Sequence, residues 1–330
     1  MTCPANSSPL PGLSLPNPAR GIQNDHGSRF QSFSVGDYDL DSTLTSGQAF
    51  RWRCVGQSWH GVIGSRWIKL TARPGAITGE VGEAVADWSW LRHYLQLEVV
   101  LADVLETFPK DESLEAAVKA CRGLRLLRQE PWECLASFIL SSTKQILQIQ
   151  QIVALLCERY GKPLAVPRGH RLAYAFPSAQ RLAELSETDL RACKMGFRAP
   201  YLLETARSIS SGQFDLAKLH TLNAAEARIQ LMALPGVGRK IADCVLLFAY
   251  GFQNAFPVDV WVTKALRQLY FPRQVVKPQQ LHGFAAKYFG PNAGYAQQYL
   301  FHYMRILQPA MPQDQNSRTK PRKSHIRRAI

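Results

Sequence analysis

Residues 234–244 read LPGVGRKIADC, and this stretch decides the fold of the chain. Before it, residues 224–233 place apolar side chains at helical spacing, and a second helical pattern follows. Gly236 and Gly238 bracket Val237, which predicts a tight hairpin between two helices with Val237 packed inward. The backbone N–H groups would then point outward, where the N-terminus of the second helix can bind phosphate. The same sequence also suits an ordinary turn between packed helices.

Lys240 lies in the first turn of the second predicted helix, where the helix dipole disfavours a cation. A lysine there can bind phosphate, or its amine can be kept partly neutral and attack an electrophile. A solvated surface lysine is the simpler alternative. Four residues later, Cys244 projects from the same helical face, although a buried cysteine is usually only a small hydrophobic side chain. The hairpin thus places a candidate nucleophile beside a candidate phosphate site.

A carboxylate follows the hairpin in the sequence FPVDVW, residues 256–261. Asp259 precedes a new helical pattern, which makes it a candidate N-cap. A carboxylate at this point can also face the hairpin, where it would stabilise a developing cation on a deoxyribose ring and assist proton transfer. The residues alone leave both roles open.

The composition favours an anionic partner. The chain has 330 residues, of which 46% are hydrophobic, enough for one large or two modest globular domains. Its 39 Lys and Arg outnumber 25 Asp and Glu, and the net charge of +14 favours nucleic acid or a membrane surface. Residues 315–330 contain six basic side chains and no acidic one, namely Arg318, Lys320, Arg322, Lys323, Arg327 and Arg328. Because these account for less than half of the excess, the rest of the chain is basic as well.

The patterns around the hairpin indicate two kinds of structure. Residues 1–29 are rich in Pro, Ser, Asn and Gly, and we expect them to be disordered. Between residues 49 and 81, aromatic and β-branched residues alternate with polar ones between Gly- and Pro-containing turns, as in a small antiparallel sheet. Further along, apolar residues recur at three- and four-residue spacing and predict helices.

The sequence therefore predicts an α+β fold. A small antiparallel β-rich N-terminal domain, residues 30–109, would pack on a larger all-helical domain, residues 110–311, which contains the hairpin. Residues 312–330 would form a basic, flexible tail.

Cysteine use and hydropathy predict an intracellular protein, in the cytoplasm or nucleoid or, in a eukaryote, in the nucleus. The seven cysteines include no CxxC pair, which favours reduced thiols over a disulfide framework. No apolar run reaches the roughly 18 residues of a membrane span, and the N-terminus lacks a secretory signal pattern. No group of His, Asp and Glu has metal-ligand spacing. We therefore expect no membrane contact, no metal and no other cofactor.

The motifs together resemble a known family. LPGVGRKIADC followed by PVDVWV, with the lysine and the aspartate nineteen positions apart, resembles the helix-hairpin-helix DNA glycosylase superfamily. The resemblance to the eukaryotic-type 8-oxoguanine DNA glycosylases extends over about residues 30–308. SGQAFRW, residues 46–52, resembles the signature of that family in the β-rich domain. Residues 123–129 with 133–135 resemble its central stretch, and residues 294–297 with Phe301 resemble its C-terminal helix.

The resemblance implies a bifunctional glycosylase and AP lyase that acts as a monomer on double-stranded DNA containing an oxidised purine, 8-oxoguanine. Such an enzyme flips the damaged nucleotide out of the duplex. Lys240 would attack the sugar C1′, displace the base and form a Schiff base, and β-elimination would then cleave the strand. Asp259 would stabilise the transition state.

The resemblance also implies how the flipped base is read. Gly47 would offer its carbonyl to the N7 hydrogen, the group that distinguishes 8-oxoguanine from guanine. Gln297 would read the pairing edge of the base. Phe301 and Cys244 would sandwich its ring, since a flipped base needs two flat or soft walls.

Contacts with the rest of the duplex follow from the same resemblance. Gly236, Val237 and Gly238 of the hairpin would bind the DNA backbone. Phe197 and Arg198 fall where the family has an aromatic wedge and an arginine beside the estranged base.

Three positions depart from the family pattern. Where the family typically has a run of asparagines, residues 141–145 read SSTKQ, with Lys144 inside the run. Gln148 replaces an arginine that reads the opposite cytosine, and Trp261 replaces a histidine that would touch the phosphate next to the lesion. These departures bear on the opposite-base preference and on phosphate binding, and they leave the chemistry of the lysine and the aspartate unchanged.

Two alternatives stay open at this point. The chain can be a helix-hairpin-helix glycosylase for another damaged base, or a non-enzymatic hairpin module that binds DNA and needs neither Lys240 nor Asp259. Endonuclease III-like and adenine-mismatch enzymes commonly carry a four-cysteine iron–sulfur cluster after the catalytic domain, and no cysteine follows Cys244. Alkyl-base glycosylases of this fold usually lack the lysine, so Lys240 argues against them.

Overall fold

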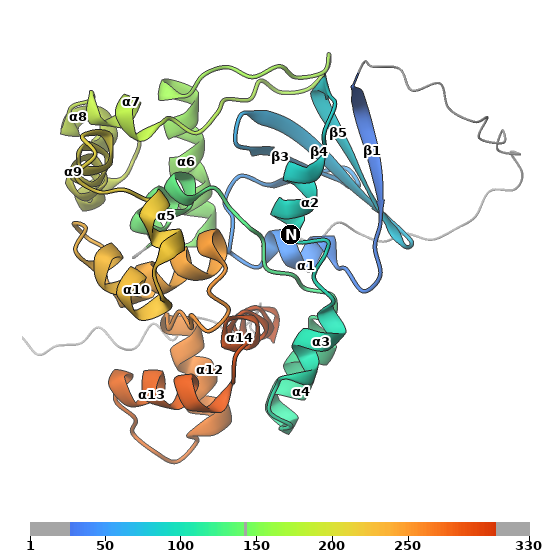
Figure 1. Ribbon diagram of the computed structural model, residues 1–330, viewed down its shortest axis with the longest axis vertical. Coiled ribbons are helices and arrows are strands. Elements are labelled where there is room, and N and C mark those ends of the chain that lie inside the picture. The colour runs from blue at the N-terminus through green and yellow to red at the C-terminus, as the bar shows by residue number, and fades with distance from the viewer. Residues whose placement is uncertain (1–26, 142–143, 308–330) are drawn as a thin grey trace, which may run out of the picture.

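A computed structural model describes residues 27–141 and 144–307 and shows a five-stranded sheet beside a larger group of helices (Figure 1). The strands are β1 (Ser28–Ser34), β2 (Arg53–Val55), β3 (Ser58–Ile63), β4 (Arg66–Arg73) and β5 (Ala76–Val85). The α-helices are α1 (Leu40–Thr45), α2 (Ser89–Leu95), α3 (Leu101–Glu106), α4 (Glu112–Ala120), α5 (Pro131–Leu140), α6 (Ile146–Tyr160), α7 (Ala179–Ala183), α8 (Glu187–Arg191), α9 (Ala199–Ser210), α10 (Ala224–Met232), α11 (Arg239–Val245), α12 (Val260–Tyr270), α13 (Pro278–Tyr288) and α14 (Ala293–Leu307). Shorter segments are the 3-10 turns η2 (Gly196–Arg198) and η3 (Ala217–Thr221) and the π-helical turn η4 (Leu246–Tyr250). The predicted α+β fold is confirmed.

The sheet is antiparallel throughout, in the order β1-β5-β4-β3-β2. Along β5, buried Ile77 and Val81 share one face with Gly79, as the period of two in a half-buried strand requires. α2 covers this face, since a Cβ at Gly79 would lie 3.0 Å from Leu91 Cδ2. The alternation read between residues 49 and 81 therefore predicted the central strands correctly.

β1 is a strand that the sequence pattern did not indicate. It begins at Ser28, within the segment expected to be disordered, and only Phe33 of its residues is buried. Its sequence, SRFQSFS, lacks a clean alternation of buried and exposed residues. β1 is an edge strand, and its ladder of hydrogen bonds with β5 holds it in place. The disorder expected for residues 1–26 and the tail expected for residues 312–330 lie outside the described residues.

Two hydrophobic cores meet at the turn that follows α1. Ala49 and Trp52 are buried in the core under the sheet, whereas Phe50 belongs to the core of the helices. The Phe50 ring packs edge-on against Phe138 of α5, with the ring centres 5.5 Å apart. The turn thus has a fixed position relative to both parts of the molecule.

A second connection is the extended segment 124–130, which runs from the end of α4 to the start of α5. Leu124 and Leu126 are buried in the helical core, whereas the next residue, Leu127, is buried in the sheet core. Backbone hydrogen bonds hold the segment to both sides: Arg128 N donates to Tyr94 O at 2.9 Å, and Gln129 N donates to Phe248 O at 2.8 Å. The two parts of the molecule therefore share one chain segment.

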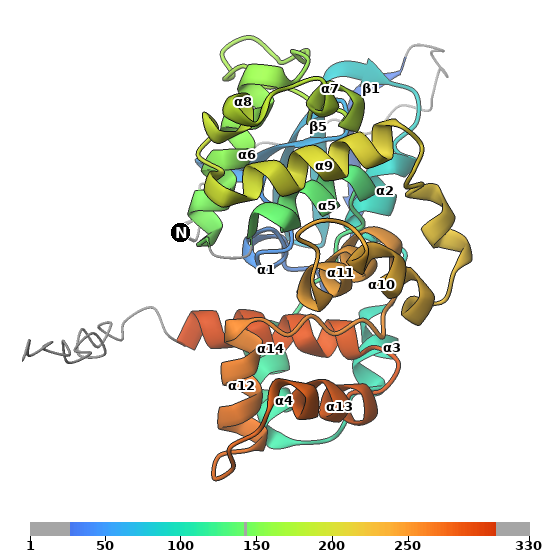
Figure 2. The same cartoon turned by 90° about the vertical axis from the view of Figure 1, so that its left-hand side faces the viewer.

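The helices are arranged so that α11 packs on α5 and on α10, and α12 packs on α14 (Figure 2). The loop of residues 161–178, between α6 and α7, extends across to the sheet, where Ala165 lies against Gly82 of β5 (Figure 1). These contacts bring the last turn of α5, helix α11, the start of α12 and the middle of α14 next to the turn that follows α1.

Candidate active site

LPGVGRK forms the predicted hairpin between α10 and α11. Val237 is buried in the helical core, as expected, and its backbone N–H donates to Leu234 O at 3.1 Å. That N–H is used by the turn itself, so the amides left without intrahelical partners are those from Gly238 onward, at the start of α11. Gly236 has a φ of +74°, and a Cβ there would lie 2.8 Å from the ring of Tyr201. Only glycine fits this position without strain.

Lys240 extends from the first turn of α11 to the end of α5. Its Nζ donates to Ser141 Oγ at 3.0 Å and lies 5.2 Å from the centre of the Phe138 ring. Ser141 Oγ donates its own proton to Phe138 O at 2.8 Å, so its lone pairs face the amine. Lys240 is thus held at a defined place and is not a freely solvated surface lysine. Only an amine with a free electron pair can attack an electrophile.

Asp259 is the N-cap of α12 and also faces the same cavity as Lys240. Its Oδ1 accepts from the backbone N–H of Val262 at 2.8 Å. Burial raises the pKa of this carboxyl, whereas the Val262 N–H and the charges of Lys240 and Arg305 lower it. The two roles that the sequence left open are compatible, because the cap holds the carboxylate where it interacts with Lys240.

One small cavity brings together all six residues to which the sequence assigned chemistry or base recognition. The cavity is lined by Gly47, Phe138, Lys240, Cys244, Phe248, Pro257, Asp259, Gln297, Gln298 and Phe301. These side chains come from the turn after α1, from α5, α11, η4, the start of α12 and α14. Residues as far apart in the chain as Gly47 and Phe301 therefore converge on one point.

Gly47 needs its glycine for two reasons. Its φ is +76°, and a Cβ there would lie 2.8 Å from Ile146 Cδ1 and 3.2 Å from Phe301 Cε1. Two glutamine side chains anchor the turn around it. Gln298 Nε2 donates to Ser46 O at 2.7 Å, and Gln129 Nε2 donates to Gln48 O at 2.6 Å. The backbone of Gly47 is therefore held against α14.

Phe301 closes the cavity in this state. Its ring lies over Gly47, and the guanidinium of Arg305, one helical turn later, lies 5.4 Å from the ring centre. The cavity has a volume of about 40 Å³, far below the roughly 150 Å³ of a cavity that holds benzene. A purine can enter only if the Phe301 ring moves away from Gly47.

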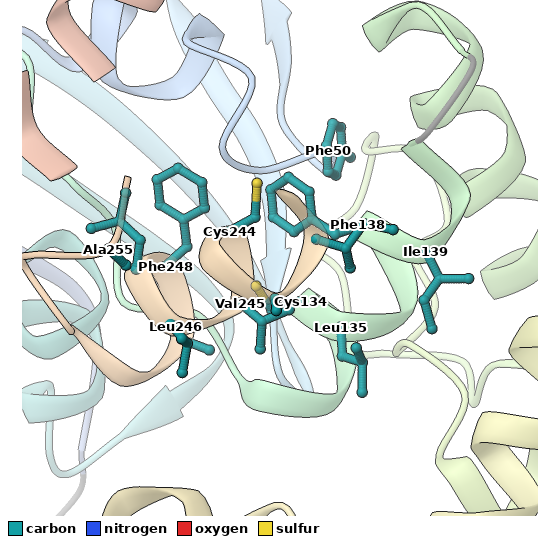
Figure 3. Close-up of a cluster of buried hydrophobic side chains, with 14 of the residues drawn as sticks. Phe50, Cys134, Leu135, Phe138, Ile139, Cys244, Val245, Leu246, Phe248 and Ala255 are labelled. Carbon is teal, nitrogen blue, oxygen red and sulfur yellow. The ribbon is translucent and has the colours of Figure 1, made fainter. Parts of the chain in front are cut away.

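Gln297 and Cys244 line the cavity with groups of different chemistry. Gln297 is almost fully buried, and its Oε1 has no hydrogen-bond partner within the described part of the chain. A buried acceptor without a partner is costly, which points to a ligand that supplies the missing donor. Cys244 points to the same side of the chain as the rings of Phe138 and Phe248 (Figure 3), which stack on each other with their centres 5.6 Å apart. Burial raises the pKa of this thiol to about 12, so it stays neutral.

Phe197 and Arg198, the expected wedge pair, lie beside the hairpin. Phe197 is half-exposed on η2. The Arg198 guanidinium lies 4.8 Å from the centre of the Phe197 ring and 5.5 Å from that of Tyr201, and its Nη1 donates to Gly236 O at 3.4 Å. The wedge and the hairpin are therefore in direct contact.

The three residues that depart from the family pattern lie outside the cavity. Lys144 is half-exposed just before α6. Gln148 is exposed in the first turn of α6, and its Oε1 accepts from the backbone N–H of Gln145 at 3.0 Å. Trp261 is half-buried in the first turn of α12, two residues after Asp259. Ser142 and Thr143, in the same run as Lys144, are not among the described residues.

Several residues at the site were not anticipated from the sequence. Ser141 and Phe138 contact the amine of Lys240, Gln298 holds the turn at Gly47, and Arg305 interacts with Asp259. Gln298 was detectable, since it is adjacent to Gln297 in a helix that the family resemblance covers. The others act through contacts between elements far apart in the chain, which no local pattern reports.

Two further properties concern the described residues only. Within residues 27–141 and 144–307, no helix is long and apolar enough to cross a membrane. The same ranges contain no group of three or more His, Cys, Asp or Glu side chains that could hold a metal ion.

Comparison with known proteins gives matches along most of the chain. Residues 32–135 match the family model for the N-terminal domain of 8-oxoguanine DNA glycosylase, and residues 136–291 match that of the HhH-GPD superfamily of base excision DNA repair proteins. An N-glycosylase/DNA lyase of Arabidopsis thaliana is 33% identical over 280 residues, which cover 79% of this chain and 76% of the plant protein. A probable N-glycosylase/DNA lyase of Methanothermobacter thermautotrophicus is 29% identical over 302 residues, covering 82% of this chain and 95% of the archaeal protein.

A solved structure gives the same result. The 8-oxoguanine glycosylase/lyase of Clostridium acetobutylicum, in complex with double-stranded DNA containing cytosine opposite 8-oxoguanine, superimposes with a TM-score of 0.77 at 30% identity. The match covers 85% of this chain and 99% of the bacterial one. The N-terminal sheet and the helical hairpin domain thus occur together in this chain, and the chain belongs to the HhH-GPD superfamily of base excision DNA repair proteins, with the N-terminal domain of the 8-oxoguanine DNA glycosylases.

Proposed function

We propose that this protein is a bifunctional DNA glycosylase and AP lyase that excises 8-oxoguanine from duplex DNA. The observation that carries the proposal is the single cavity in which Lys240 and Asp259 lie beside the side chains that would read a base. The relatives named N-glycosylase/DNA lyase support the same reaction. A module that only binds DNA needs neither an amine held by Ser141 nor a buried carboxylate next to it.

The chemistry begins at C1′ of the flipped nucleotide. Nζ of Lys240, after losing a proton, attacks C1′, the C1′–N9 bond breaks, and its electron pair leaves with the base. The sugar ring then opens to a Schiff base, and β-elimination breaks the C3′–O bond, with the phosphate as leaving group. The Asp259 carboxylate stabilises the positive charge that develops on the sugar and is the nearby group able to accept a proton from the amine.

Recognition of the base uses the remaining walls of the cavity. The Gly47 carbonyl accepts the N7 hydrogen of 8-oxoguanine, which guanine lacks. Gln297 Oε1, which has no partner among the described residues, accepts from an N–H of the pairing edge. Phe301 moves off Gly47 and stacks on one face of the base, and the neutral Cys244 thiol contacts the other.

The partner is double-stranded DNA that contains the oxidised purine, and the acting unit is the monomer. The six residues assigned to the chemistry and to base recognition meet in one cavity of a single chain, which supports the monomer as the acting unit. The hairpin, Phe197 and Arg198 are in contact on the same part of the surface, where they can meet the DNA backbone and the estranged base. We place the protein inside the cell, where its substrate is found.

The proposal is tested with duplexes carrying one 8-oxoguanine opposite each of the four bases. Base release and strand nicking are assayed separately, and borohydride is added to trap the Schiff base. We expect base release, strand nicking and a covalent protein–DNA product from the wild type. Lys240→Gln should give neither nicking nor the covalent product, because its amide keeps size and polarity but cannot form an imine. Trapping in Lys240→Gln would remove this lysine from its role. Absence of base release from the wild type would refute the substrate.

A further inference from the structure

Two charged side chains of α11, Arg239 and Asp243, lie on a part of the helix that does not line the cavity. Lys240 and Cys244 face the cavity, whereas Arg239 and Asp243, one position earlier in each case, lie one step round the helix. Arg239 is the first residue of α11 and follows Gly238 of the hairpin directly. Any side chain at this position is adjacent to the amides that bind the DNA backbone.

The charges in this group do not cancel. Asp243 is buried, with a side-chain exposure of 2%, and its Oδ1 lies 2.6 Å from Arg228 Nε of α10. Its Oδ2 lies 3.6 Å from Arg239 Nε, whose side chain is 49% exposed. Two guanidinium groups thus share one carboxylate, and that carboxylate already makes its short contact with Arg228. Arg239 therefore keeps positive charge that is free to interact with an anion.

A cavity opens beside Arg239. It has a volume of about 450 Å³ and is lined by Arg239 and five residues of α13, namely Pro278, Gln279, His282, Gly283 and Ala286. The lining contains no carboxylate. His282 lines this cavity together with Arg239, and burial and the charges of Arg239 and Arg228 lower its pKa. The imidazole is therefore a neutral group next to the exposed guanidinium, and it can donate a hydrogen bond.

We propose that Arg239 and His282 bind a second backbone phosphate of the duplex, next to the phosphate held by the hairpin amides. The inference rests on the proposed function for its ligand, duplex DNA. Each strand carries one phosphate per ~3.4 Å of helix axis, so a duplex that places one phosphate on the hairpin brings a neighbouring phosphate to the side chain that follows the hairpin. A guanidinium holds a phosphate through directed paired hydrogen bonds, and the imidazole N–H adds another.

The test measures binding of an undamaged duplex by fluorescence anisotropy over a range of salt concentrations. Each phosphate contact contributes about 0.9 to the slope of log affinity against log salt concentration. Arg239→Gln is expected to lower that slope by about 0.9, so that a fourfold rise in salt weakens its binding about 3.5-fold less than that of the wild type. Arg239→Lys, which keeps the charge, is expected to keep the wild-type slope. Arg73→Gln removes an exposed arginine at the far end of β4 and serves as the matched control without effect.

A second measurement locates the phosphate. Single phosphates of the duplex are replaced in turn by neutral methylphosphonate. One phosphate, the one held by the hairpin, should be the most sensitive position in every variant. At the phosphate next to it, we expect the replacement to weaken binding by the wild type several-fold and to leave binding by Arg239→Gln unchanged. His282→Ala is expected to weaken binding of the unmodified duplex at an unchanged salt slope, because a neutral imidazole releases no counterion.

The outcomes are separable from the proposed function. An unchanged slope in Arg239→Gln overturns the inference, and so does a reduced slope that Arg239→Lys fails to restore. A thermal unfolding midpoint is recorded for each variant, so that a loss of folded protein is not read as a loss of binding. Base release by the wild type is measured independently, and its failure would refute the substrate while leaving the phosphate contact testable on the undamaged duplex.

Discussion

The ring of Tyr201 occupies the space that a side chain at Gly236 would need. A Cβ built on Gly236 lies 2.8 Å from Tyr201 Cγ and Cδ2, and the φ of +74° disfavours any other residue. By contrast, a Cβ at Gly238 meets nothing within 4 Å, because that side of the hairpin is open. The structure therefore requires glycine at position 236 and leaves room for a side chain at position 238.

Gly236→Ala should lower the free energy of unfolding by about 2 kcal/mol or more, since it combines left-handed backbone strain with a clash against a ring. Gly238→Ala should cost much less stability, only the modest penalty of alanine at an N-cap, and yet bind duplex DNA more weakly, because the methyl group stands where the phosphate approaches. Thermal unfolding and duplex binding measured on both variants check this pair. Equal destabilisation by the two substitutions would contradict it.

Asp259→Asn should slow base release by about 10²-fold, the usual effect of removing one charged group that stabilises a transition state. The fold should be preserved, because asparagine is as good an N-cap as aspartate and can still accept from Val262 N. Single-turnover base release gives the rate, and thermal unfolding gives the control. A fully active variant would leave Asp259 with the cap alone.

Arg305→Gln should shift the acidic limb of the pH–rate profile to higher pH. Burial raises the pKa of Asp259, and the positive charges of Lys240 and Arg305 lower it. Removal of Arg305 lets that pKa rise further, so the carboxylate is lost at a higher pH, while the rate well above the pKa changes less. Arg305→Lys keeps the charge and should keep the limb in place. An unmoved limb in Arg305→Gln would show that the two groups do not interact during catalysis.

The wild type should prefer cytosine opposite the lesion only modestly, with the other three bases accepted within about tenfold, or roughly 1.4 kcal/mol. Gln148 is neutral and can present either its donor or its acceptor, so it cannot demand an acceptor-rich base as a guanidinium does. Arg198 can supply part of the selectivity, but in this state it donates to Gly236 O.

Gln148→Arg should sharpen the preference for cytosine. It also removes the acceptor for Gln145 N, so Gln148→Ala, which loses that cap without adding a donor, is the matched control. Base release from the four duplexes is the measurement for both variants. A wild type more than a hundredfold selective for cytosine would show that other residues read that base.

The residues predicted from sequence differ from the missed ones in a physical way. Gly236, Val237 and Lys240 form a local signature, in which spacing alone fixes a turn and the start of a helix. Ser141 and Arg305 act through contacts across the cavity, and nothing in their own neighbourhood marks them. β1 was missed for a similar reason, because an edge strand with both faces largely exposed has no hydrophobic alternation.

The extended segment 124–130 has a consequence for how the molecule unfolds. Leu127 completes one core and Leu126, its neighbour, completes the other, so neither core can lose its packing without pulling on the same stretch of backbone. The two parts should melt in one cooperative transition, with equal calorimetric and van't Hoff enthalpies. A chain cut at residue 135, where the two family models meet, would divide α5 in its middle. Neither fragment should keep a closed core, and we therefore expect the two named domains to fold and unfold as one unit.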